Sequence, residues 1–110
     1  MTVSVTVGSW LARRRPAPPP ALTQRLRELL ADDADAPAAV AAQACLAAGE
    51  RVLRRLLAEG CAARGAALDL LTADALVTYA FEAAAADPAT LDEISGRSMS
   101  SIAALAEHGG

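Results

Sequence analysis

The chain has 110 residues, of which 54% are hydrophobic, 21% are charged and only 3% are aromatic. This length corresponds to one domain and excludes a multidomain enzyme, and the hydrophobic content excludes a disordered chain. The net charge of −3 differs from the basic footprint of nucleic-acid-binding proteins. Because the core must consist mostly of Leu, Val and Ala, and Ala is the best helix former, the composition predicts an all-α fold.

Residues 1–20 are expected to form a mobile, proline-rich arm outside the packed domain. Within it, residues 3–7 alternate Val with hydroxyl residues, a strand pattern that needs a partner or gives way to a helical turn near Trp10. The segment also contains a candidate recognition motif, formed by Arg13, Pro16 and Pro19. This spacing matches the ligands of SH3-type grooves. The favoured interpretation is a stiff spacer that leads into a helix at Pro20.

Hydrophobic spacing predicts an antiparallel helical bundle over residues 21–107, followed by a tail at 108–110. The expected helices cover 21–31, 37–59, a span from between 61 and 68 to 86, and a span from about 88 to 107. Gly60 is expected to end the second of them, Asp35 or Ala36 to cap its start, and Thr90 with Glu93 to cap the start of the fourth. The first helix is the shortest, so three long helices form most of the bundle.

The second predicted helix has an apolar face whose first half is built from small residues. They are Ala41, Cys45, Ala48 and Gly49. Small side chains let another backbone come close, so this half is expected to make the tightest helix contact. Cys45 and Cys61 have no spacing that suits zinc, and we interpret them as buried free thiols in a reducing cytoplasm.

The third predicted helix is apolar on most sides, which is typical of a central helix. Its polar positions form a seam of Asp74, Thr78 and Glu82. The four-residue spacing places them on one face, and Asp74 is expected to be at least partly buried. One hypothesis is a structural or interface seam paired with Arg51, Arg54, Arg55 or Arg64. The other is a ligand site beside the seam. The structural hypothesis is favoured, because ion-pair networks often hold carboxylates without a functional role.

Catalysis, cofactors and membrane insertion are not expected. The single His, His108, lies near the end of the chain, and no metal-ligand set, P-loop or dinucleotide motif occurs. The N-terminus lacks the pattern of a signal peptide, and the most apolar stretch, residues 65–86, contains three carboxylates that disfavour a membrane span. All ten basic residues are Arg, which suggests a GC-rich bacterial coding sequence. We therefore expect a cytoplasmic bacterial protein.

Residues 73–82 read Ala-Asp-Ala-Leu-Val-Thr-Tyr-Ala-Phe-Glu. This stretch resembles an internal helix of the trans-isoprenyl (polyprenyl) diphosphate synthases, and residues 102–106 with Gly109 and Gly110 loosely fit the next helix of that family. The resemblance implies an all-α fold and a bundle prone to dimerise. The two Asp-rich motifs with which that family holds magnesium and diphosphate are absent, and the run Asp32-Asp33-Ala34-Asp35 does not replace them. Prenyl transfer by this chain is therefore not expected.

The sequence thus favours a non-catalytic helical interaction or oligomerisation module. Its expected partner is a second copy of the chain or another helical protein. The alternative is an accessory protein, ligand-binding or like an isoprenoid synthase, that uses a pocket near Asp74, Thr78 and Glu82. An open apolar pocket with unpaired carboxylates would favour this alternative, and a closed seam paired with Arg would favour the first hypothesis.

Overall fold

The computed structural model describes residues 5–60, 65–85 and 88–108. The helices and 3-10 turns within these ranges are α1 Val7–Ala12, α2 Pro20–Leu29, η1 Ala31–Asp33, η2 Ala38–Val40, α3 Ala41–Glu59, α4 Ala66–Ala84 and α5 Pro88–His108. The only extended pairing in the described part is an isolated bridge between Thr6 and Pro37. The predicted all-α bundle is confirmed.

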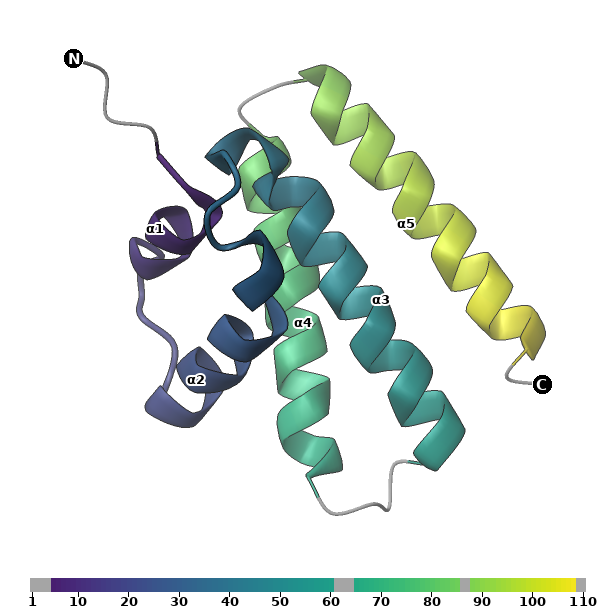
Figure 1. Ribbon diagram of the computed structural model, residues 1–110. Coiled ribbons are helices and arrows are strands. Elements are labelled where there is room, and N and C mark those ends of the chain that lie inside the picture. The colour runs from purple at the N-terminus through teal and green to yellow at the C-terminus, as the bar shows by residue number, and fades with distance from the viewer. Residues whose placement is uncertain (1–4, 61–64, 86–87, 109–110) are drawn as a thin grey trace.

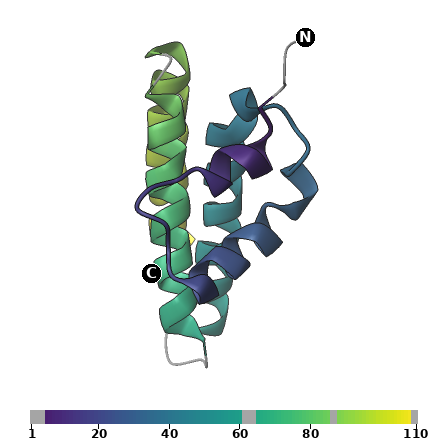
Figure 2. The same cartoon turned by 90° about the vertical axis from the view of Figure 1, so that its left-hand side faces the viewer.

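The centre of the fold is the antiparallel pair of α3 and α4, which share the most extensive helix contact. α5 runs beside this pair in the same direction as α3 (Figure 1) and contacts both of its helices. α1 and α2 lie on the other side of the pair and cross it, as the turned view shows (Figure 2). The molecule is therefore a bundle of three long helices with two short helices packed on one side.

The close packing predicted for the first half of α3 is confirmed. Ala41, Cys45 and Ala48 are fully buried. A Cβ atom added to Gly49 would lie 3.4 Å from the Leu76 Cβ atom of α4, a distance that leaves little room for a side chain. Small residues thus let the two backbones approach each other and form the central contact. Gly60, at a φ of 84°, ends α3 as expected, because such a conformation favours glycine.

The start of α3 differs from the sequence expectation. Instead of a helix beginning at Pro37 with Asp35 or Ala36 as cap, a 3-10 turn occupies residues 38–40, and neither η2 nor α3 has a side-chain cap. The reason is a long-range pairing of backbones. The Val7 N–H donates to the Ala36 carbonyl at 2.9 Å, and the Ala38 N–H donates to the Val5 carbonyl at 2.8 Å. These bonds hold the segment before α3 in an extended form.

The N-terminal segment of residues 5–14 is packed on the bundle. The expectation that residues 1–20 form an arm outside the packed domain is therefore wrong for residues 5–14. Val7 is fully buried, and α1 begins with a reciprocal cap. The Ser9 N–H donates to the Thr6 Oγ1 atom at 3.1 Å, and the Thr6 N–H donates to the Ser9 Oγ atom at 3.0 Å. Trp10 meets Tyr79 of α4 edge to face, with ring centroids 6.1 Å apart. Apolar burial and aromatic contact therefore anchor α1.

α5 begins at Pro88, as expected, but Thr90 then lies inside the helix rather than at its cap. The helix extends to His108, one residue into the predicted tail. Several residues named in the predictions lie outside the described part of the chain: Cys61, Arg64, Gly109 and Gly110.

Candidate functional site

The polar seam of α4 lies on the surface. Asp74, Thr78 and Glu82 are all exposed, so the expected burial of Asp74 is wrong. The reason is the orientation of α4, whose buried face carries Ala73, Leu76 and Ala80 and leaves the seam on the opposite side. Asp74 and Thr78 make no side-chain hydrogen bond or ion pair with described residues, and the two hollows that we describe below are lined by other residues.

Glu82 has a partner, although not one of the predicted arginines of α3. Its Oε2 atom lies 3.6 Å from the Nη1 atom of Arg14, which follows α1. The same guanidinium lies over the Trp10 ring, 4.1 Å from its centroid, and donates to the Trp10 carbonyl at 3.2 Å. Arg14 was expected to belong to the mobile arm. It instead joins the N-terminal segment to α4 through its charge pair with Glu82, and its cation–π contact with Trp10 holds the guanidinium in place.

We expect Asp74→Ala to change the free energy of unfolding by no more than about 0.5 kcal/mol, because an exposed carboxylate without a described partner stabilises little. If Asp74 were buried and paired, Asp74→Ala would instead lower the free energy of unfolding by a larger amount. Thermal unfolding at neutral pH measures the effect, and Asp92→Ala, at another exposed carboxylate, is the matched control. A loss of several kcal/mol for Asp74→Ala alone would show that the seam is buried.

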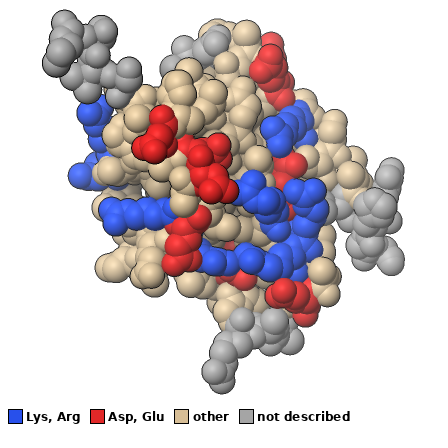
Figure 3. Space-filling view, viewed as in Figure 1, with Lys and Arg blue, Asp and Glu red and all other residues tan. Residues whose placement is uncertain are grey.

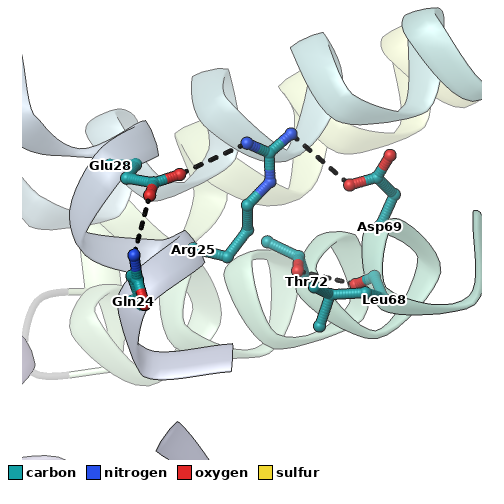
Figure 4. Close-up of polar contacts among 6 residues, drawn as sticks. All are labelled: Gln24, Arg25, Glu28, Leu68, Asp69 and Thr72. Carbon is teal, nitrogen blue, oxygen red and sulfur yellow. Dashed lines mark hydrogen bonds and ion pairs between the residues drawn. The ribbon is translucent and has the colours of Figure 1, made fainter. Parts of the chain in front are cut away.

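A different carboxylate of α4 is partly buried and paired. Asp69 lies in the first turn of α4, where a negative charge is favourable near the helix N-terminus. Its Oδ1 atom is 3.5 Å from Arg25 Nη2, while Arg25 Nη1 is 3.5 Å from Glu28 Oε2 on the same helix. The guanidinium thus bridges α2 and α4 (Figure 4). The hydrophobic periodicity of the sequence could not predict the ion pair of Arg25 and Asp69, because the two residues are 44 positions apart.

Cys45 is a free, buried cysteine, as the sequence predicted. Burial raises the pKa of its thiol to about 12; by smaller amounts, the charge of Arg14 lowers this pKa and the charge of Asp33 raises it. The thiol therefore stays protonated at neutral pH and lacks the thiolate that nucleophilic or metal chemistry requires. Its role in the structure is that of a small hydrophobic residue in the core.

The proline-rich motif lies in and beside the connection between α1 and α2. Arg13, Pro16 and Pro19 are exposed, and Pro19 has extended dihedral angles before α2. Arg13 instead ends α1 with a φ of −91° and a ψ of −2°, which is not a polyproline II conformation. The motif is therefore accessible but is not a single extended segment in this structure.

One end of the bundle exposes large apolar side chains. Ile94, Ser98 and Ile102 are spaced four residues apart and therefore lie on one stripe of α5. Ile94 is 1% exposed and Ser98 is 9% exposed, but Ile102 is 60% exposed. With Met99, which is 69% exposed, Ile102 gives the described part of α5 an exposed apolar surface.

The neighbouring helices add to this surface. The Arg97 Nε atom lies 3.1 Å from Glu50 Oε1, and since α3 and α5 run in the same direction (Figure 1), this pair places Leu57 level with the last turns of α5. Leu57 is 56% exposed and Leu70, in the facing turns of α4, is 46% exposed. We use the term apolar end for four residues: Leu57, Leu70, Met99 and Ile102.

The charged side chains form a different surface. Basic and acidic groups are interspersed on the face that Figure 3 shows, without one dominant sign. Described contacts on the chain include Arg97 with Glu50 and a hydrogen bond of 3.1 Å from Arg51 to the Leu29 carbonyl. Such a mixed surface is typical of a solvated helix face.

Comparison with known proteins finds no matching family model, no matching curated protein and no matching solved structure. Among the residues that the structure describes, no group of three or more His, Cys, Asp or Glu side chains could hold a metal ion. No helix in the described ranges is both long and apolar enough to cross a membrane. The apolar end is therefore the candidate site that the geometry singles out.

Proposed function

We propose that the chain is a non-catalytic helical interaction module that associates with a second copy of itself through the apolar end. The observation that carries this proposal is the loss of burial along one stripe of α5, from Ile94 to Ile102. A helix stripe whose apolar residues are covered at one end and exposed at the other is typical of a surface that another helix packs against.

The size of the exposed surface supports the proposal. The chain has an accessible surface of 6908 Å², whereas a compact monomer of this mass is expected to expose about 5,700 Å². The radius of gyration, 14.3 Å, is also above the roughly 13 Å of a compact domain of this length.

A second copy fits this surface better than a charged partner. The four residues of the apolar end carry no charge, and obligate homodimer interfaces are the more hydrophobic class. A two-fold axis would place the same helices against each other, so each Ile102 would face apolar side chains of the other copy. The buried, protonated Cys45 is compatible with a reducing cytoplasm, which we include in the proposal with a bacterial origin.

The oligomeric state tests the proposal. We expect the wild-type chain to run as a dimer in size-exclusion chromatography with light scattering, and Ile102→Glu or Leu70→Glu to give a folded monomer, because a charge in an apolar interface is costly. Leu71→Glu is the matched control. Leu71 is 59% exposed and follows Leu70 directly, so it points about 100° away.

Two results would contradict the proposal. One is a wild-type monomer at the highest soluble concentration. The other is an equal loss of dimer in Leu71→Glu, which would place the interface on a different face of α4. Circular dichroism of each variant shows whether the helices are retained, so that loss of the dimer can be separated from unfolding.

A further inference from the structure

A second surface feature lies between α1, α2 and η1. Two adjoining hollows, of about 340 Å³ and about 150 Å³, share the lining residues Gly8, Leu11 and Arg27. The larger volume is within the range of small-molecule sites. Gly8 belongs to the wall because α1 approaches the chain closely there. Its N–H donates to the Ala34 carbonyl at 3.0 Å, and an added Cβ would lie 3.2 Å from that oxygen.

The lining combines apolar and positively charged groups. Leu11 of α1 and Ala31 and Ala34 of the η1 segment contribute accessible apolar surface, and Leu26 and Leu30 lie buried beneath it. The charged residues that line either hollow are all arginines, namely Arg14, Arg15 and Arg27. The charged lining of the two hollows is therefore positive, although the chain as a whole has a net charge of −3. This combination is complementary to a ligand with an apolar body and an anionic end.

The three guanidinium groups are not equally available. Arg14 is held by Trp10 and Glu82, and Arg15 Nη1 donates to the carbonyls of Ala12 and Arg14. Arg27 is exposed and makes no hydrogen bond or ion pair with described residues. Since Arg27 lines both hollows, a group bound to it would lie at the point where they adjoin.

We propose that this hollow binds a small amphipathic carboxylate, with its alkyl chain against Leu11, Ala31 and Ala34 and its carboxylate on Arg27. The planar guanidinium presents two parallel donors that match one carboxylate, which favours a single anionic group over a long acidic peptide. The site is lined by α1, α2, η1 and the connection before α2. It shares no residue with the apolar end, so it does not depend on the proposed dimer.

Decanoate is a suitable probe, and decylamine is its control of opposite charge and equal chain length. We expect decanoate to shift the amide resonances of Gly8, Leu11 and Arg27 in two-dimensional NMR spectra of the full chain, and decylamine to leave them unchanged. Arg27→Ala should weaken decanoate binding about tenfold, because one charge-assisted contact is lost. Arg54→Ala, at an exposed arginine of α3, should have no effect.

Ala31→Phe provides a second test that leaves the arginines in place. Ala31 lines the larger hollow and is exposed, so a phenyl ring can enter the hollow without disturbing the core and should reduce decanoate binding. Three results would overturn the proposal. They are the absence of shifts with decanoate, equal shifts with decylamine, and shifts centred on Leu70 and Ile102 instead of the hollow.

Discussion

Leu76→Ala is expected to lower the free energy of unfolding by about 2–5 kcal/mol, the range for removing a large buried aliphatic side chain. Leu76 is fully buried at the centre of α4, and its Cβ lies next to the position of Gly49 on α3. Neighbouring atoms would close the resulting cavity only in part, because the two backbones are already close. The loss is a large fraction of the 5–15 kcal/mol that stabilises a typical domain.

Leu71→Ala is the control for this prediction. It removes the same atoms from the same helix, but Leu71 is 59% exposed, so its effect should stay within about 0.5 kcal/mol. Chemical denaturation at one protein concentration measures both variants, which keeps any contribution from dimerisation constant. Similar losses for the two variants would mean that α4 does not face α3 as described.

The helices from α2 onward could be predicted because their sequences carry local signals. The i, i+4, i+7, i+8 spacing of Leu22, Leu26, Leu29 and Leu30 predicted α2, and Gly60 marked the end of α3. These features depend on residues within a few turns of one another, so they can be read without knowing the fold.

α1 could not be predicted with the same certainty, because its stability depends on distant residues. It has six residues, fewer than an isolated helix needs, and its sequence contains Val, Ser and Gly, which are poor helix formers. Backbone hydrogen bonds to Ala34 and Ala36 hold the N-terminus of α1, and its Trp10 ring packs against Tyr79. The strand-like alternation of residues 3–7 corresponds in the described part only to the short bridge at Thr6.

The orientation of α4 was the main error in predicting the site. Large apolar residues surround this helix on most sides, so the sequence did not define which side would face its neighbours. A helical wheel placed Asp74 near Leu70 and Phe81 and suggested burial, but Leu70 is itself 46% exposed. The small residues of α3 decide the orientation, since Gly49 receives Leu76 and Val77 and the seam is left on the solvent side.

Those small residues lead to the second large effect, which is expected for Ala48→Leu. Ala48 is fully buried in α3, directly before Gly49, where the backbones of α3 and α4 come close. A leucine there must displace its neighbours, and overpacking of this kind lowers the free energy of unfolding by about 1–3 kcal/mol. The melting temperature would fall by roughly 4–8 °C for each kcal/mol lost in a domain of this size.

Ala58→Leu is the matched control, because it adds the same atoms to the same helix at an exposed position. Alanine and leucine have similar helix propensities, so the control should leave the melting temperature nearly unchanged. The difference in melting temperature between the two variants then measures how tightly the surroundings of Ala48 are packed. An unchanged melting temperature for Ala48→Leu would show that this half of α3 is not packed against a close neighbour, and the central contact of the fold would have to be assigned to other residues.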